Sequence, residues 1–211
     1  MLPIESIIAF VTVSALLSIV PGPDNIFVLM QSALYGKKSG VLVTLGLCTG
    51  LIVHTTAVAL GIAAVFQASI VAFTVLKIVG ALYLAYLAWQ AFRATAQPLE
   101  TAESNSRSSG ALYRRGIIMN ITNPKVSVFF LAFLPQFASP DNGPLAPQIL
   151  LLGGLFILVA LVTFSAIAAA AGVLGGWFNN SPKVQVYLNR IAGTVFAGLA
   201  VKLLASTADG D

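Results

Sequence analysis

Long apolar runs alternate with short polar interruptions along the whole chain. A helix needs roughly 20 consecutive apolar residues to cross the hydrocarbon core of a bilayer. Runs that meet this need cover residues 4–34, 41–66, 70–92, 112–137, 146–173 and 184–204. Stretches such as residues 41–52 and 149–160 show no alternation of apolar and polar positions, which excludes the strands of a membrane β-barrel. The pattern predicts an all-α integral membrane protein with six transmembrane helices.

Polar and helix-breaking residues mark the ends of the predicted spans. Clear interruptions lie at 36–40, 142–144 and 179–182. The boundary at 67–69 is less marked, but residues 39–76 contain no Asp, Glu, Lys or Arg and are too long for one span, so we expect a hairpin of two spans there. The first run is longer than a straight span needs, and its pattern leaves open whether it tilts, unwinds or re-enters.

The polar stretch 93–115 predicts a flexible linker that separates a first three-helix repeat, 1–92, from a second, 116–211. Because three spans is an odd number, homologous halves would have opposite orientations, as in the inverted repeats of many secondary transporters. Each half carries proline in its first span, at Pro21-Gly22-Pro23 and at Asn123-Pro124, where a helix loses a backbone donor. We therefore expect a 3+3 inverted repeat in which helices 1 and 4 are broken.

Composition excludes several other classes of protein. Hydrophobic residues make up 58% of the 211 residues, charged residues make up 9%, and the mean hydropathy is +0.93, which excludes a soluble globular fold. The single cysteine, Cys48, excludes an intramolecular disulfide and a zinc–cysteine cluster, and we expect no cofactor and no bound metal. No phosphate-binding Gly-rich loop with Lys-Ser/Thr is present, which excludes an ATP-driven pump for this chain.

The net charge of +4 comes from basic residues at segment ends, which favours membrane orientation over a nucleic-acid partner. The residues assigned to one side are Lys37, Lys38, Arg93, Arg107, Arg114, Arg115 and Lys183. The opposite loops carry Asp141 and no Lys or Arg, so the positive-inside rule predicts a cytoplasmic linker and both termini outside. The start of the chain lacks the basic region of a cleavable signal peptide, so we expect the first segment to be retained.

Three charged residues are predicted to lie within the bilayer, where a charge costs about 2.5 to 3.5 kcal/mol on insertion scales. Asp24 follows the first break and Lys125 follows the second, so we expect an ion pair between the halves. In one interpretation this pair is functional: each residue can leave the other to bind a proton or the amino or carboxylate group of a zwitterion. In the other, the two charges only neutralise each other and hold the bundle together. Lys77 lies in the outer third of its span and is expected to snorkel.

Other polar residues in the predicted spans have two possible uses. Asn25 and Asn123 either bind a substrate or bridge helices, and the packing use is favoured for Asn120, Thr122, Gln31 and Gln136. His54, the single histidine, either shuttles protons or bonds to a neighbouring helix.

Glycine and aromatic residues indicate helix packing. Pairs four residues apart, Gly36/Gly40, Gly46/Gly50 and Gly172/Gly176, predict close helix contacts and permit a homodimer. Tyr83, Tyr86 and Trp89 are expected to pack or to lie at the membrane interface.

Several motifs taken together resemble one known family. They are Ser-Ile-Val-Pro-Gly-Pro-Asp-Asn at 18–25, Gly-x-x-x-Gly-x-x-x-His at 46–54, Gly-Ala-Leu-Tyr-Leu at 80–84, Asn-Ile-Thr-Asn-Pro-Lys at 120–125 before Phe-Phe at 129–130, and Leu-Pro-Gln-Phe at 134–137. In this order the motifs resemble the LysE/RhtB superfamily of bacterial amino-acid exporters. Ala88 stands where the family commonly has glycine, and Ile121-Thr122 stands where two leucines are frequent.

The resemblance implies export of an amino acid or a derivative across the cytoplasmic (inner) membrane, driven by the proton gradient. Its partners would be the amino acid, protons and the lipid bilayer. The transport path would be lined by Pro21, Gly22, Pro23, Asp24, Asn25, Asn120, Asn123, Pro124 and Lys125, with His54 as a secondary polar site.

The sequence bears on two other functions besides export of an amino acid. The alternative is efflux of another small solute or a metal ion on the same scaffold, although a metal exporter would be expected to offer more carboxylates, thiols or imidazoles in the membrane. No nucleophile recurs with a base and an orienting group, so we do not expect an enzyme.

Overall fold

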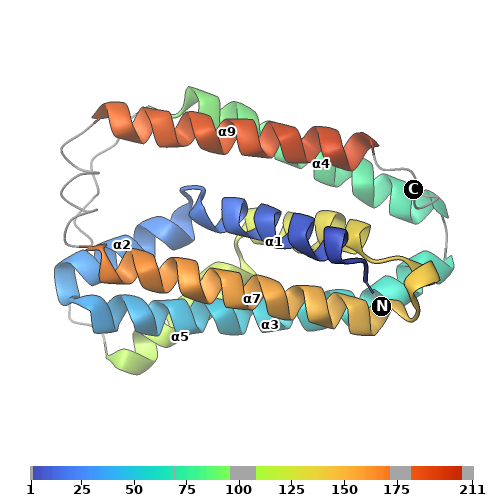
Figure 1. Ribbon diagram of the computed structural model, residues 1–211. Coiled ribbons are helices and arrows are strands. Elements are labelled where there is room, and N and C mark those ends of the chain that lie inside the picture. Colours follow the sequence, from blue (N-terminus) through green and yellow to red (C-terminus); the bar gives the residue numbers. More distant parts are fainter. Residues whose placement is uncertain (1, 69, 96–107, 172–181, 206–211) are drawn as a thin grey trace.

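The computed structural model describes residues 2–68, 70–95, 108–171 and 182–205 (Figure 1). Every regular element in these residues is helical, which confirms the all-α prediction. The elements are α1 (Ile4–Ile19), α2 (Pro23–Tyr35), α3 (Lys37–Ala68), α4 (Ile70–Arg93), α5 (Ser109–Ile121), α6 (Pro124–Val128), the π-helix η1 (Phe129–Phe133), the 3-10 helices η2 (Leu134–Phe137) and η3 (Pro140–Asn142), α7 (Leu145–Ala169) and α9 (Pro182–Ala205).

Four to six membrane spans can be formed by the described helices. Lys37–Gly61, Thr74–Arg93, Leu145–Ala169 and Gln185–Ala205 are each long and apolar enough to cross a bilayer. Two further spans result if each bent pair counts as one: α1 with α2, bent by 57°, and α5 with Pro124–Phe137, bent by 49°. These four helices and two bent pairs correspond to the six apolar runs of the sequence.

The helix ends differ from the predicted boundaries in four places. The predicted flexible linker 93–115 is wrong over its last residues, because α5 begins at Ser109, where the Ser108 side chain accepts from the N–H of Ala111 and caps the helix. The first run is two helices, because Pro21 and Pro23 lack the N–H groups that would continue α1. Lys37 and Lys38, predicted as loop, begin α3, since Gly36 alone makes the turn with a φ of 84°. The fourth run changes from α- to π- and 3-10 helix before Pro135, which lacks the N–H that an α-helix would bond to the carbonyl of Leu131.

The helices form a layered bundle (Figure 1). α4 packs against α9 in one layer, and α3 packs against α5 and α7 in the opposite layer. α1, η1 and η2 lie between the two layers. Outward-facing residues are apolar: Leu60, Val162 and Val201 are 76%, 70% and 66% exposed, as expected where lipid replaces water.

The described basic residues that the sequence assigned to one side lie together at one end of the bundle, whereas Lys202, in the last turn of α9, lies at the other end. The starts of α3, α5 and α9 and the end of α4, which carry Lys37, Lys38, Arg93, Arg114, Arg115 and Lys183, are at the left in Figure 1. The start of α1 and the end of α9 are at the right. Arg107 lies outside the described residues.

Glycines bring α3 and α5 into close contact. A Cβ on Gly46 would overlap the backbone carbonyl of Tyr113, and a Cβ on Gly50 would lie 2.7 Å from the Asn120 side chain. The close contact predicted for Gly46/Gly50 is confirmed. For Gly36/Gly40 the prediction is wrong at Gly36, which has no atom near the position of a Cβ and acts as the turn described above. Gly172 and Gly176 lie outside the described residues.

Candidate functional site at two helix breaks

The first break leaves backbone carbonyls of α1 without their helical donors. In an α-helix the carbonyl of Leu17 would accept from residue 21, which is proline, and the carbonyl of Ser18 would accept from Gly22, which is extended. Lys125 Nζ donates to the carbonyls of Leu17 and Val20, both at 3.3 Å. Asn25 Nδ2 donates to the carbonyl of Ser18 at 2.6 Å. Buried polar side chains thus replace the helix's own donors.

The second break positions Lys125 for this contact. Asn123 caps the start of α6, because its Oδ1 accepts from the backbone N–H of Lys125 at 3.0 Å, and Pro124 occupies the first helical position. Gly22 faces the lysine: a Cβ there would lie 3.1 Å from Lys125 Nζ. The two breaks, about one hundred residues apart in the chain, therefore form one buried site.

Asp24 lies in the same site but does not form the predicted ion pair. Its Oδ2 accepts from Asn120 Nδ2 at 3.4 Å, and its side chain is 2% exposed. The charges of Asp24 and Lys125 attract each other. No ion pair joins these two described residues, because the carbonyls at the end of α1 bind the ammonium instead. The direct contact predicted from the sequence is wrong in this state.

His54 adjoins the site through Asn120. His54 Nε2 lies 3.2 Å from the backbone oxygen of Asn120, and its ring packs 5.6 Å from the ring of Phe130. Gly50, one turn earlier on α3, leaves the space that Asn120 occupies. His54 therefore contacts the neighbouring helix α5. The residue it contacts there, Asn120, also donates a hydrogen bond to Asp24.

Several buried polar atoms of the site have no hydrogen-bond partner within the described protein. They are Asp24 Oδ1, Asn25 Oδ1, Asn120 Oδ1, Asn123 Nδ2 and Ser18 Oγ. An unsatisfied buried polar group costs about 1–3 kcal/mol, so a stable fold keeps such groups mainly where a ligand, water or ion satisfies them. Ser18 was not predicted as a site residue, and only its place in the motif at 18–25 marked it.

A cavity of about 530 Å³ lies beside the two breaks. Residues of both breaks line it, including Gly22, Asn123 and Lys125. Its other wall comes from α4 and α9, with Tyr83, Trp89, Gln90 and Arg93 on α4 and Asn189 on α9. The sequence had indicated only packing or interface roles for Tyr83 and Trp89, and it did not single out Gln90, Arg93 or Asn189 as site residues.

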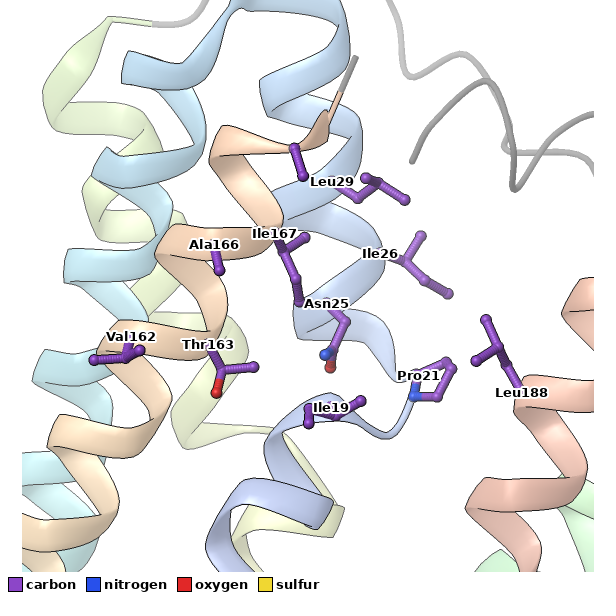
Figure 2. A pocket seen from close by; sticks show the side chains of 11 residues that line it. Ile19, Pro21, Asn25, Ile26, Leu29, Val162, Thr163, Ala166, Ile167 and Leu188 are labelled. Atoms are coloured by element: carbon purple, nitrogen blue, oxygen red, sulfur yellow. The ribbon is translucent and has the colours of Figure 1, made fainter. Parts of the chain in front are cut away.

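A second cavity of about 530 Å³ borders the first break on its other side, between α2 and α7 (Figure 2). Its lining is apolar except for Asn25 and Thr163, which Figure 2 shows beside Pro21, Ile19 and Ile167. Pro21 lines both cavities. The break thus borders one cavity whose lining includes charged and polar residues and a second whose lining is almost entirely apolar.

The remaining polar candidates were Thr122, Gln136, Gln31 and Lys77. Thr122 donates to the carbonyl of Ile118 at 2.8 Å, and Gln136 donates to the carbonyl of Ala132 at 3.4 Å, each within its own segment. Gln31 is buried on α2, and Lys77 is partly buried on α4. Within the described residues, no group of three His, Cys, Asp or Glu side chains is placed to hold a metal ion.

Comparison with known proteins places the chain in a family. The family model for the LysE type translocator matches residues 15–207. The chain is 38% identical over 199 residues to a homoserine/homoserine lactone efflux protein of Salmonella typhimurium, covering 94% of this chain and 95% of the relative. It is 31% identical to an uncharacterized membrane protein of Vibrio cholerae, covering 95% and 97%, and 30% identical to the uncharacterized membrane protein YrhP of Bacillus subtilis, covering 94% and 98%.

No solved structure matches the chain. The family consists of translocators, which is consistent with a protein that is not an enzyme. With its apolar helices and bent helix pairs, the chain belongs to the LysE type translocator family and is a multi-pass membrane protein.

Proposed function

We propose that the chain exports an amino acid or an amino-acid derivative from the cytoplasm across the bacterial cytoplasmic membrane, in exchange for protons. The observation that carries this proposal is the buried site at the two breaks, where Asp24 and Lys125 lie among unsatisfied asparagine atoms beside a cavity. A zwitterion carries one positive and one negative charge, which match Asp24 and Lys125, and it can form hydrogen bonds with the unpaired polar atoms of the site. Relatives named homoserine/homoserine lactone efflux proteins support this substrate class.

The proposed scaffold is a 3+3 inverted repeat of residues 1–92 and 116–211 joined by the polar segment 93–115, the last part of which, 109–115, begins α5. It is supported by the bends of 57° and 49° in the first span of each half. Broken helices at corresponding positions are typical of secondary transporters, whose substrates bind at the breaks. The helices around the two breaks have unequal lengths, so the proposed symmetry is approximate.

The proposed orientation puts the basic helix ends in the cytoplasm and both termini outside. The cavity lining continues along α4 from Tyr83 to Arg93, the basic end of that helix, so this orientation makes the site accessible from the cytoplasm. The helices α1, η1 and η2 lie toward the end of the bundle away from those basic helix ends (Figure 1), and they carry the packed rings of Phe10, Phe129, Phe133 and Phe137, with centroids 5.1 to 6.1 Å apart. The described conformation then corresponds to an inward-facing state.

Orientation is testable by labelling introduced cysteines in whole cells with a membrane-impermeant maleimide. We expect Asp141→Cys, on η3, to be labelled from outside, and Lys183→Cys, at the start of α9, to be labelled only after the cells are opened. The wild-type protein is the background control, because its Cys48 is only 7% exposed. Labelling of Lys183→Cys in intact cells would reverse the assignment.

In the proposed cycle, the substrate's carboxylate binds Lys125 and its ammonium binds Asp24. On the outer side a proton neutralises Asp24, which removes the attraction for the substrate's ammonium and for Lys125. The substrate then leaves, the protonated carrier returns to the inward-facing state, and the proton is released into the cytoplasm. The proton gradient thereby drives export.

Replacing Asp24 by asparagine tests the coupling. Asparagine keeps the size of the side chain but binds no proton, so in proteoliposomes we expect Asp24→Asn to lose all acceleration of amino-acid movement by an imposed proton gradient. In the wild-type protein a gradient of one pH unit, about 1.4 kcal/mol for one coupled proton, should support about a tenfold accumulation of the amino acid. Asp141→Asn is the matched control, since this carboxylate lies on an exposed turn. Full gradient-driven transport by Asp24→Asn would refute the proposed coupling.

A further inference from the structure

Among the residues that the structure describes, the cavity beside the breaks is lined by two cations and by no carboxylate. Lys125 lines it at the breaks, and Arg93 lines it from the last turn of α4. Asp24 interacts with Lys125 but is not among the residues that line the cavity. The side chains of Tyr83, Gln90, Asn123 and Asn189, which also line the cavity, carry no formal charge. This described part of the lining therefore attracts negatively charged groups and offers no compensation for an additional positive charge.

Arg93 is held at the cavity by an aromatic neighbour. Its Cζ lies 4.5 Å from the centroid of the Trp89 ring, one turn earlier on α4, and Trp89 lines the same cavity. The ring face attracts the guanidinium, whose N–H groups lie in one plane. A planar fork of this kind suits the two oxygens of a carboxylate.

The position of Arg93 relative to Lys125 suggests an order of binding. Tyr83 and Arg93 are ten residues apart, or roughly 15 Å along α4, so the lining extends well away from the central part of the helix. Arg93 is exposed at the basic end of the bundle, whereas Lys125 is 8% exposed at the breaks. A solute that enters from the basic end meets Arg93 before it meets Lys125.

We propose that Arg93 recruits the substrate's carboxylate at the mouth of the cavity and passes it to Lys125, and that the cavity thereby selects amino acids with neutral or acidic side chains over basic ones. This inference rests on the proposed function and deepens it by naming the substrate class. Arg93 acts on capture, so its loss raises KM more than it lowers the maximal rate.

Homoserine and its lactone form a matched pair of probes, because the lactone is a cyclic ester without a free carboxylate. In everted membrane vesicles, uptake into the vesicle reports export. There we expect Arg93→Gln to raise KM for homoserine about fivefold, because the variant loses one positive charge that attracts the carboxylate. We expect KM for the lactone to change by less than about twofold. Arg93→Lys keeps the charge but not the planar fork and should restore part of the affinity for homoserine. Lysine should be a poor substrate of the wild-type protein.

Arg114→Gln is the control for a general change in surface charge. Arg114 is exposed at the same end of the bundle and does not line the cavity, so its loss should leave KM for both probes unchanged. An equal rise of KM for homoserine and lactone in Arg93→Gln, no rise for either, or the same rise in Arg114→Gln would overturn the recruiting role. Preferred transport of lysine by the wild-type protein would overturn the substrate class. Wild-type vesicles that move none of the three compounds would overturn the proposed function itself and this inference with it.

Discussion

Lys125→Met is expected to abolish transport and to destabilise the bundle. The variant keeps an unbranched side chain but removes the ammonium that donates to the carbonyls of Leu17 and Val20. It also leaves the buried carboxylate of Asp24 without the opposite charge that attracts it. Removing one partner of a buried charge pair typically costs about 3–5 kcal/mol. We therefore expect a lower midpoint of thermal unfolding in detergent and no substrate movement in vesicles. Lys183→Met, on an exposed helix end, is the matched control.

The double variant Asp24→Asn with Lys125→Met separates function from packing. Removing both charges eliminates the uncompensated carboxylate, so part of the lost thermal stability should return. Transport should not return, because neither a proton nor a zwitterion then finds a charged partner. If the double variant transports at the wild-type rate, the two residues only neutralise each other and the proposed site is wrong.

Gly46→Leu is expected to prevent correct packing of the bundle. A side chain at this position would overlap the backbone carbonyl of Tyr113 on α5, and backbone cannot yield as a flexible side chain does. Overpacking against side chains alone costs about 1–3 kcal/mol, and the cost here is expected to exceed that range because α3 and α5 would have to separate. The measurement is the yield of monodisperse protein in detergent and its unfolding midpoint.

Gly154→Leu is the control for this substitution. Gly154 lies on α7, where an added Cβ would meet no atom within 4 Å. The same side chain there should change stability by less than about 0.5 kcal/mol, the usual range for positions without contacts. Equal loss of protein in both variants would show that leucine is harmful at any glycine, and that the approach of α3 to α5 is not the cause.

The positions of the breaks followed from the sequence, but the contacts made there did not. Pro21, Pro23 and Pro124 predict helix ends from local chemistry, because a proline has no N–H wherever it lies. The position of the Lys125 ammonium, in contrast, depends on which hydrogen-bond acceptors the folded chain brings close to it. The end of α1 brings the carbonyls of Leu17 and Val20 to it, and these contacts replace the ion pair with Asp24 that charge alone predicted.

The residues that line the cavity likewise could not be identified from the sequence. Tyr83, Gln90, Arg93 and Asn189 lie on apolar spans at spacings that resemble ordinary packing or interface positions, and their common cavity arises only when α4 and α9 lie opposite the two breaks. The family motifs include Tyr83 but do not mark the other three. These residues are therefore candidates that the structure adds to the site.

By itself, the sequence determined that the chain is an all-helical membrane protein, which apolar runs cross a bilayer, where they break, and to which family the chain belongs. Each of these depends on local properties: the length of an apolar run, the missing proline donor, or the order of short motifs. Tertiary structure alone decided which helix faces meet, for example where Gly46 of α3 contacts the backbone of Tyr113 on α5. These contacts in turn decide which polar atoms form hydrogen bonds, which have no partner, and which residues line the cavity. Hydrogen bonds and cavities are formed between distant segments, and their geometry is set by packing over the whole bundle rather than by any local pattern.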